Sequence, residues 1–508
     1  MTMLNADQRS RDLAWAAEET VDLLVVGLGV TGAGVALDAA SRGLSVLAVD
    51  AHDLAFGTSR WSSKLVHGGL RYLAKGQLGV AHESAVERGI LMERSAPHLS
   101  RAMPMVLPLT SAVGRGQGVL AMQGFRAGDL LRRAARTSGL LLPGPRRLSS
   151  SGTAARVPGV HPSVRGGLLS HDGQLEDDAR LVIALARTAA GHGARVVTKV
   201  RASSLSGSGG VLEDELTGGR LTVRARAVVN ATGVWADRLV DGLTLTPSRG
   251  THLVLRQSSL PGVEVAVAAP VPGSVNRFVF TLPQPDGLVY LGLTDEPVDG
   301  AVPDVPVPSQ EEIDFLLTTA STAFERPLTH ADVVGAYAGL RPLLAGAGGS
   351  ADLSREHAVL TSPDGVVTVV GGKLTTYRRM AEDAVDAVVA AGLAAGPCRT
   401  RDLPLVGAAP RSRLAAVEAP ARLVRRYGVE APAVISAARS TGLAEDELLA
   451  PVAEGVPVTL AELVWGVTHE GALDVDDLLD RRTRVGLVAS DRAAAEPAAR
   501  RALTLGGL

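Results

Sequence analysis

Hydrophobic residues near the start of the chain fall into two short runs separated by a helical stretch. Residues 21–26 (VDLLVV) form an apolar run rich in β-branched side chains, which predicts a strand. A glycine-rich turn and an alanine-rich segment follow, and residues 44–49 (LSVLAV) form the second apolar run. The order strand, turn, helix, strand predicts a βαβ unit with parallel strands.

Similar patterns recur along the rest of the chain. We predict helices over residues 80–99 and 175–190, and after a glycine pair at 371–372, where apolar residues follow helical spacing. Further strands are predicted at 194–200, 221–229 and 366–370, and residues 250–295 alternate as a sheet would. From about residue 404 the chain is rich in Ala and Arg with helical spacing, which indicates a separate helical C-terminal domain.

The turn after the first strand carries a G-x-G-x-x-G motif at Gly27, Gly29 and Gly32, and Asp50 ends the second strand. The first glycine permits a tight turn, the second lets the backbone approach a pyrophosphate, and the third lets the helix pack closely. The helix N-terminus supplies free N–H groups for phosphates. A carboxylate at Asp50 can accept hydrogen bonds from a ribose hydroxyl. We predict a dinucleotide site here, the alternative being an ordinary βαβ unit.

Two later segments favour FAD over NAD as this dinucleotide. The strand at 221–229 runs into NATG at 230–233, whose small residues would let a cofactor pass beside the glycine turn. The late strand ends in Gly371-Gly372, and the positive end of the next helix could stabilise negative charge on reduced flavin. The early glycine motif, the middle ATG and the late Gly-Gly occur in the order that flavoproteins with a two-dinucleotide fold use. With one G-x-G-x-x-G, no second site for a nicotinamide cofactor is evident.

Composition and charge narrow the class of protein. The 508 residues suggest two to four domains, and a formal net charge of −2 gives no basic excess for nucleic acid. Cys398 is the only cysteine, which excludes an internal disulfide and a cysteine-rich metal site and fits a reducing compartment. The polar N-terminus lacks the apolar core of a signal peptide, and no uncharged apolar stretch reaches ~18 residues. We therefore expect a cytoplasmic protein without a membrane span or a bound metal.

Residues 115–147 form a basic and partly amphipathic stretch. Seven arginines are interleaved with Leu, Met and Phe, against a single acid, Asp129. The simpler interpretation is a solvated helix of a substrate domain. The alternative is a contact with the cytoplasmic face of the cell membrane, where cations attract anionic lipids and apolar side chains insert shallowly.

Motifs from residue 21 to about 390 resemble those of the FAD-dependent glycerol-3-phosphate dehydrogenases of aerobic respiration, within the wider group of amino-acid-oxidase-like flavoproteins. They are VVGLGVTGAGVALDAASRGLSVLAVD, TSRWSSKLVHGGLRYL, LEDDARLV, VVNATGVWAD, YAGLRPL, SREHAVL and GGKLTTYRRMAEDAV. The resemblance implies an α/β fold, in which a Rossmann-like FAD domain of the two-dinucleotide type (21–395) is interleaved with a mixed-sheet substrate domain (roughly 80–150 and 246–340). A tail or short leading helix (1–20) precedes them, and a helical C-terminal domain (400–508) follows.

By this resemblance, the chain oxidises sn-glycerol 3-phosphate to dihydroxyacetone phosphate by hydride transfer from C2 to FAD, and its electrons pass to membrane quinone. A phosphate monoester needs a cluster of cations. The motifs supply Arg71, Tyr72 and Arg355 as substrate contacts, and Arg341 and Lys373 beside the flavin and the substrate. Together with the glycine turn and Asp50, they imply FAD contacts from Thr58, Ser62, Ser63, His67, Val200, Ala231, Thr232, Gly233, Gly372, Lys373, Leu374 and Thr375.

The reaction also needs a base for the proton of the C2 hydroxyl. His252, in RGTHLVL, and His67, in KLVHGG, are the histidines with a claim to this role, and a neutral imidazole has a suitable pKa. We favour His252. The alternative is that both histidines only bind substrate or flavin and that cations assist deprotonation.

Other functions remain open at this point. An oxidase of the same fold would pass electrons to oxygen and release hydrogen peroxide, and the sequence does not distinguish the two acceptors. An amino-acid oxidase would need one carboxylate clamp instead of a cation cluster. A flavoprotein that binds RNA is disfavoured by the net charge. The resemblance also leaves a homodimer open.

Overall fold

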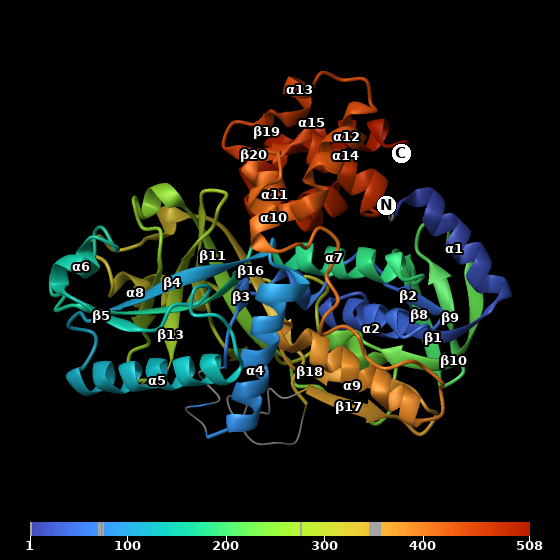
Figure 1. Ribbon diagram of the computed structural model, residues 1–508, viewed down its shortest axis with the longest axis horizontal. Helices are drawn as coiled ribbons and strands as arrows, with labels where there is room; N and C mark the ends of the chain where they lie inside the picture. Colours follow the sequence, from blue (N-terminus) through green and yellow to red (C-terminus); the bar gives the residue numbers. More distant parts are fainter. Residues whose placement is uncertain (1–2, 70–72, 74–75, 275–276, 345–356) are drawn as a thin grey trace.

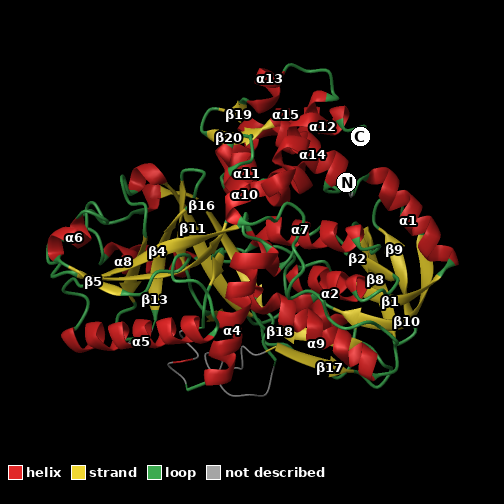
Figure 2. Cartoon of the chain, viewed as in Figure 1, coloured by secondary structure: helices red, strands yellow, loops and turns green. Residues whose placement is uncertain are grey.

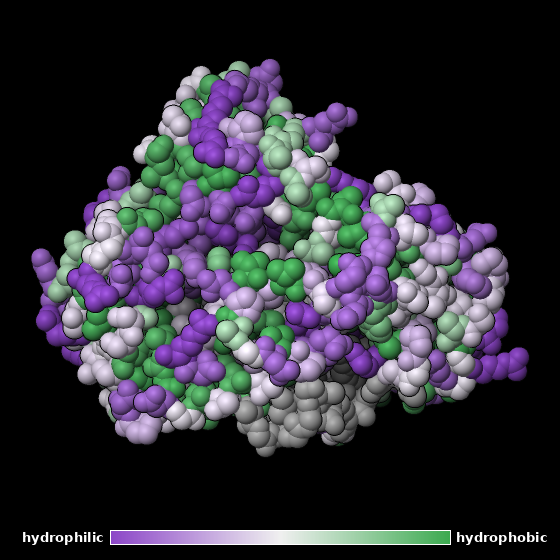
Figure 3. Space-filling model, turned by 180° about the vertical axis from the view of Figure 1, so that it is seen from behind, coloured by the Kyte–Doolittle hydropathy of each residue, from purple (hydrophilic) through white to green (hydrophobic). Residues whose placement is uncertain are grey.

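Two sheets and a helical lobe make up the chain. The computed structural model describes residues 3–69, 73, 76–274, 277–344 and 357–508. The two sheets lie beside each other, and the lobe formed by the last hundred residues stands above them (Figure 1). Seen from behind, hydrophilic and hydrophobic residues alternate over the broad body beneath the lobe (Figure 3).

The first sheet has the order β17-β18-β10-β1-β2-β7, and the strands from β18 to β7 run parallel. Short apolar strands buried on both faces are typical of such sheets. The strands are β1 (Thr20–Val26), β2 (Val46–Val49), β7 (Arg195–Val197), β8 (Val200–Ser206), β9 (Gly209–Asp214), β10 (Arg220–Asn230), β17 (His357–Thr361) and β18 (Val367–Gly371). Strands β8 and β9 form an antiparallel extension on β10.

Helices cover this sheet with small and aliphatic side chains. One face carries α2 (Val30–Ser41), α7 (Asp178–Gly191) and α9 (Tyr377–Ala390), which bury the largest apolar cluster of the described residues. Helix α1 (Ala6–Glu18) packs against β7 and β10, so the segment expected as a tail or short helix is an ordered helix.

The second sheet has the order β15-β11-β14-β13-β12-β4-β6-β3, with β16 paired to β11 and β5 to β6. Its strands are β3 (Leu65–Val66), β4 (Ser100–Pro108), β5 (Arg146–Leu148), β6 (Gly167–Leu175), β11 (Ser248–Arg256), β12 (Ala266–Pro270), β13 (Phe278–Pro283), β14 (Leu288–Gly292), β15 (Glu296–Pro297) and β16 (Val333–Arg341). The helices that accompany it are α4 (Leu78–Ile90), η2 (Leu91–Ser95), α5 (Arg115–Ala134), α6 (Ser150–Ala154), η4 (Gln257–Ser259), α8 (Gln310–Ser321) and η5 (His330–Asp332).

The C-terminal lobe is mainly helical and includes a small hairpin (Figure 2). It contains α10 (Arg411–Ala415), α11 (Ala421–Tyr427), η7 (Gly428–Glu430), α12 (Ala431–Arg439), α13 (Glu445–Leu449), β19 (Pro451–Ala453), β20 (Val456–Thr459), α14 (Leu460–His469), η8 (Asp477–Arg482), η9 (Val485–Leu487) and α15 (Ala489–Leu505). Its own apolar cluster surrounds the buried Trp465.

The predicted fold class is confirmed, and the local differences have physical causes. The predicted strand at 194–200 is two strands, because Lys199 adopts a left-handed conformation between them. The helix predicted at 80–99 is α-helical only to Ile90 and continues as a π-helical turn from Leu91 to Ser95. Helix α8 was not predicted, although Ser309 and Glu312 form a capping box that marks its start. In the described ranges, no helix is long and apolar enough to cross a membrane.

Candidate active site

A cavity of about 1110 Å³ is lined by residues from both sheets. This volume exceeds the roughly 300–1,000 Å³ of a typical small-molecule pocket, so one large cofactor and a small substrate can share it. The turn between β1 and α2 and the loop after β2 line one side. Strands β4, β11, β13 and β16 contribute to the other.

The glycine turn is as tight as its motif predicts. Gly27 has φ of +96°, and a Cβ at Gly32 would lie 1.7 Å from the Gly27 carbonyl oxygen. Helix α2 therefore begins directly beside the strand end, and Gly29, Val30 and Thr31 present its N-terminus to the cavity. A helix N-terminus with bare backbone at this place suits a pyrophosphate.

Asp50 is held next to this turn by backbone donors. One carboxylate oxygen accepts the Leu28 N–H at 2.7 Å and the other accepts the His52 N–H at 2.8 Å. Burial, with a smaller contribution from the nearby Asp53, raises the pKa of Asp50 to about 6 against the lowering effect of these hydrogen bonds. The carboxylate lines the cavity, where it can accept a ribose hydroxyl.

Two further segments complete this side of the cavity. Ala231 follows β10 and lies so close that a Cβ on Gly27 would be 2.7 Å from its carbonyl oxygen. Gly371 and Gly372, at the end of β18, both have positive φ, which lets the chain turn into η6 (Leu374–Thr376) beside the cavity. The small residues leave room for an extended dinucleotide. The N–H groups at the start of α2 suit the pyrophosphate of FAD, and the Asp50 carboxylate suits its ribose.

His252 on β11 is the central titratable group of the opposite side. It is 2% exposed, its Nε2 lies 2.8 Å from Ser63 Oγ, and its ring stacks on Tyr337 with centroids 4.8 Å apart. Burial lowers the pKa of His252 well below the usual range, and the charges of Lys64 and Arg341 lower it further. The lowered pKa keeps the imidazole of His252 neutral. Its Nδ1 is buried without a hydrogen-bond partner among the described residues, which a bound substrate could supply.

A buried ion pair supports the serines beside His252. Lys64 is fully buried and donates to Asp178 Oδ2 at 2.9 Å and to the Arg60 carbonyl at 2.7 Å. The same Asp178 oxygen accepts the N–H and the hydroxyl of Ser62. Burial lowers the pKa of Lys64 and the adjacent Asp178 opposes that effect. The pair fixes the segment that carries Ser62 and Ser63 into the cavity.

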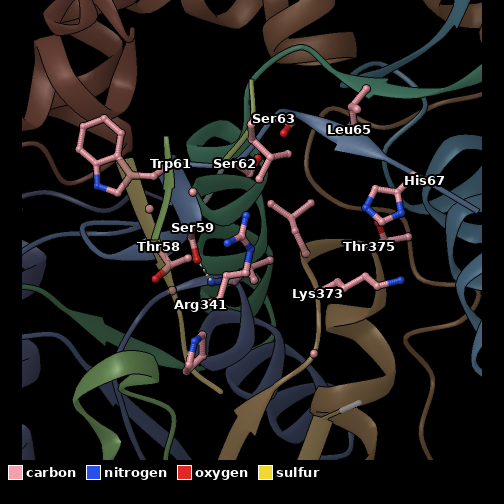
Figure 4. Close-up of a pocket in the computed structure, with 18 of the residues that line it drawn as sticks. Thr58, Ser59, Trp61, Ser62, Ser63, Leu65, His67, Arg341, Lys373 and Thr375 are labelled. Atoms are coloured by element: carbon pink, nitrogen blue, oxygen red, sulfur yellow. Dashed lines mark hydrogen bonds between the residues drawn. The ribbon is translucent and has the colours of Figure 1, made fainter. Parts of the chain in front are cut away.

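Arg341 and Lys373 supply positive charge to the cavity. Arg341, at the end of β16, donates to Asp295 Oδ1 at 2.9 Å and to Ser248 Oγ at 3.1 Å. Lys373 directly precedes η6 and donates to Ser84 Oγ at 3.3 Å. In the view of Figure 4, Trp61 and Thr58 lie on one side of Arg341, and His67, Lys373 and Thr375 lie on the other.

Most of the predicted site residues lie on this one cavity. The cavity is lined by the predicted residues Gly27, Gly29, Asp50, Thr58, Ser62, Ser63, His67, Ala231, Thr232, Gly233, His252, Arg341, Gly372, Lys373, Leu374 and Thr375. Gly32 packs under the turn instead. Val200 is buried, its N–H donates to the Asp50 carbonyl, and its neighbours Arg201 and Ala202 line the cavity in its place. Arg71, Tyr72 and Arg355 lie outside the described residues.

Comparisons with known proteins agree with this geometry. Residues 22–378 match the model of a family described as FAD dependent oxidoreductase, and residues 398–505 match the C-terminal domain of alpha-glycerophosphate oxidase. Glycerol-3-phosphate dehydrogenase 1 of Mycobacterium tuberculosis is 54% identical over 507 residues, which cover 96% of each chain. The chain belongs to the FAD-dependent glycerol-3-phosphate dehydrogenase family.

More distant relatives also match along nearly all of this chain. The mitochondrial glycerol-3-phosphate dehydrogenase SDP6 of Arabidopsis thaliana is 34% identical, over 96% of this chain and 83% of its own. The crystal structure of the glycerol-3-phosphate dehydrogenase from Bacillus halodurans complexed with FAD superposes with a TM-score of 0.74 at 28% identity, covering 99% and 95% of the two chains. FAD is therefore the cofactor of the present chain as well.

Several polar residues of the site were not singled out from the sequence. Lys64, Asp178 and Tyr337 lie inside quoted motifs, but nothing in their spacing indicates that they meet. Arg88 and Asp172 form a buried pair at 2.6 Å on the cavity wall, and Asp295 lies under Arg341. Lys64 and Asp295 lie in loops, Arg88 and Asp178 on helices and Asp172 on β6, so no shared sequence pattern marked these residues.

Proposed function

We propose that this chain oxidises sn-glycerol 3-phosphate to dihydroxyacetone phosphate and that its electrons pass to a membrane quinone. The observation that carries the proposal is the meeting of Arg341, Lys373 and a neutral His252 on the cavity that also contains the dinucleotide turn. The printed names of the relatives, glycerol-3-phosphate dehydrogenases, support the same substrate.

The substrate carries close to two negative charges on a small polyol. Arg341 and Lys373 supply cations to the cavity, and Arg71, Tyr72 and Arg355 are proposed as further phosphate contacts. Such charge-assisted contacts distinguish glycerol 3-phosphate from glycerol. The guanidinium of Arg341 is oriented by Asp295 and Ser248, which limits its reorganisation when an anion arrives.

Oxidation of the secondary alcohol separates a hydride from a proton. FAD supplies the two-electron acceptor for the hydride when it is bound. His252 is proposed to accept the hydroxyl proton, with Ser63 holding the imidazole in place at 2.8 Å. Positive charge from Arg341 stabilises the negative charge that develops on the substrate oxygen.

The substrate is tested by an anaerobic visible spectrum of the purified holoprotein. Glycerol 3-phosphate should bleach the flavin bands, and an equal concentration of glycerol should not. Bleaching by both compounds at the same rate would exclude a phosphate site. A spectrum unchanged by glycerol 3-phosphate would overturn the proposed substrate.

An apolar arm of the cavity supports quinone as the acceptor. It is lined by side chains from β4, β12, β13 and α5, namely Met105, Leu107, Ala268, Phe278, Phe280 and Phe125. Phe278 and Phe280 alternate on one strand, so both rings face the same side of the sheet. A planar quinoid ring has matching chemistry for this arm.

The outer side of α5 supports a membrane contact. Val119, Leu120 and Leu130 are 57–64% exposed on this helix, and Leu140 beyond it is 98% exposed. Exposed arginines surround them, at positions 115, 126, 133, 136, 146 and 147. Each cation near an anionic leaflet contributes about 1 kcal/mol, and the apolar side chains can insert shallowly. Together these residues would hold the apolar arm close to the lipid phase.

The acceptor is tested with anionic liposomes at low and high salt and with menadione as a soluble quinone. We expect salt-sensitive sedimentation with liposomes, reduced binding of a Leu120→Glu/Leu130→Glu variant, and a raised KM for menadione in Phe278→Ala. No liposome binding at low salt, together with one peroxide released per substrate oxidised, would favour the oxygen-dependent oxidase instead. The match to the C-terminal domain of alpha-glycerophosphate oxidase makes that outcome the relevant alternative.

A further inference from the structure

The loop of residues 50–60, between β2 and the end of η1 (Thr58–Arg60), has two faces with different neighbours. Its inner face lines the cavity through Asp50, Ala51, His52, Phe56, Gly57, Thr58 and Ser59. Its outer face lies against η8 (Asp477–Arg482) of the C-terminal lobe. The loop therefore lies between that lobe and the cofactor side of the cavity.

Asp53 forms the central contact on the outer face. It is fully buried, and its Oδ2 accepts hydrogen bonds from Arg481 Nε at 2.6 Å and from Arg482 Nη1 at 2.7 Å. Its Oδ1 accepts a second bond from Arg482 Nη2 at 2.9 Å, which makes that pair bidentate. Burial alone would raise the pKa of Asp53, but Arg482 and Arg481 hold it well below its usual range.

The two arginines are themselves anchored within the C-terminal lobe. Arg482 donates from Nη2 to the Glu470 carbonyl oxygen at 2.8 Å and from Nε to the same oxygen at 3.1 Å. Arg481 donates to Asp477 Oδ1 at 2.5 Å, and Lys199 reaches the same oxygen at 3.1 Å. A carboxylate on the loop thus meets donors that the lobe already holds in place.

An aromatic contact ties the same lobe to the inner face. The Phe56 ring stacks on His52 with centroids 3.9 Å apart, and the guanidinium of Arg60 lies 5.1 Å above it. The guanidinium of Arg481 approaches the same ring at 5.8 Å. Because His52 donates its N–H to Asp50, a shift of Phe56 would move the residue that orients the Asp50 carboxylate.

We propose that Arg481 and Arg482 are positioning residues for FAD, which act through Asp53 and Phe56 to hold the loop that presents Asp50 to the ribose. The C-terminal lobe is then a part of the cofactor site although η8 contributes no residue to the cavity wall. The inference rests on the cofactor alone and holds for any substrate or electron acceptor.

The test measures FAD affinity of apoprotein prepared from the full-length chain, by quenching of flavin fluorescence. Arg482→Gln should raise the FAD dissociation constant by about tenfold or more. Excess FAD should restore one FAD per chain, which an unfolded protein would not show. Arg482→Lys retains the charge but loses the fork, and an intermediate dissociation constant is expected.

Arg187→Gln is the matched control. Arg187 is fully buried on α7 and bonds bidentately to Glu430 of the same lobe at 2.7 and 3.0 Å, but it does not line the cavity. This variant should lower the melting temperature and leave the FAD dissociation constant unchanged. An equal rise in both variants, or no rise in folded Arg482→Gln, would overturn the proposal.

If Arg482→Gln does not fold, Arg481→Gln tests the other arginine. This change removes one hydrogen bond to Asp53 Oδ2 and the guanidinium near the Phe56 ring, while Arg482 keeps its bidentate bond to Asp53. A raised FAD dissociation constant supports the loop as the link, and an unchanged constant contradicts it.

Discussion

The two sides of the cavity are built in different ways. The cofactor side consists of the glycine turn, the Asp50 loop and the Ala231 segment. Backbone groups and glycines without side chains determine the shape of the cavity there. The substrate side consists of His252, Arg341 and the Ser62–Ser63 segment, which ion pairs and hydrogen bonds hold in place. The first is a matter of local conformation, and the second depends on partners that are far away in the sequence.

This difference determines what a substitution does. At Gly27 and Gly32 on the cofactor side, an added side chain has no space and disrupts the site together with the local fold. On the substrate side, an altered side chain leaves the backbone intact and changes charge or orientation. Four predictions test this contrast, in order of decreasing effect.

The largest effect is expected for Gly32→Val. Even the Cβ would lie 1.7 Å from the Gly27 carbonyl oxygen, so the turn and α2 must separate. Purified protein should contain almost no FAD, as measured by flavin absorbance per chain. Gly124→Ala on α5 is the control, because nothing lies within 4 Å of a Cβ there. Normal FAD content in Gly32→Val would contradict the role of this turn.

Asp178→Asn should destabilise the folded protein by about 3–5 kcal/mol, because it leaves the Lys64 ammonium buried without its counter-charge. A lowered denaturation midpoint in urea would show this loss. Asp402→Asn, which removes an exposed pair with Arg94, should cost at most about 1 kcal/mol. Equal midpoints for the two variants would argue against a structural role of the buried pair.

Arg341→Lys should lower kcat/KM for glycerol 3-phosphate by about 10²- to 10³-fold while FAD content stays normal. An ammonium cannot keep the planar fork that Asp295 and Ser248 orient. The control is Arg249→Lys, on the adjacent strand β11, whose guanidinium pairs with Glu312 away from the cavity. Loss of FAD in Arg341→Lys would place this residue on the cofactor side instead.

The smallest effect concerns pH and Asp50. Burial raises the pKa of Asp50 from 3.8 in the unfolded chain to about 6 in the folded protein. The contribution of Asp50 to folding stability is therefore greatest below pH 3.8, and it is lost as the pH rises through 6. The ionised carboxylate is the better acceptor for a ribose hydroxyl, so FAD affinity should increase several-fold from pH 5 to pH 7.

Asp50→Asn should abolish this increase in FAD titrations over the same pH range. Asp477 also has a pKa of about 6, raised by burial and by Asp53, but it does not line the cavity. A pH dependence that persists in Asp50→Asn would exclude Asp50 as its source.

The cofactor side could be predicted from the sequence because its signals are short-range. Gly27 and Gly32 are five residues apart, and their spacing alone implies the contact that the structure contains. The small Ala231 at the end of an apolar strand carried the same kind of information. The fold class and the cofactor, which the structure and the comparisons confirm, follow from these segments.

The substrate side could be predicted only in part. The family motifs pointed to Arg341 and the need for a base pointed to His252, but no pattern shows that Ser63 and His252, 189 positions apart, would lie 2.8 Å from each other. Lys64 and Asp178 were not predicted for the same reason. Contacts between distant charges depend on how the two sheets pack, which hydrophobic periodicity does not specify.

The bond between Asp53 and Arg482 also has a consequence for how the protein is made. These residues are 429 positions apart, and at ~5–20 residues per second a ribosome needs roughly 20–90 s to reach the second after the first. During that interval the residues of the glycine turn have been synthesised, but the loop beside it lacks its outer support. Cofactor loading is then a late event of biosynthesis, and nascent chains that end before residue 482 should emerge without tightly held flavin.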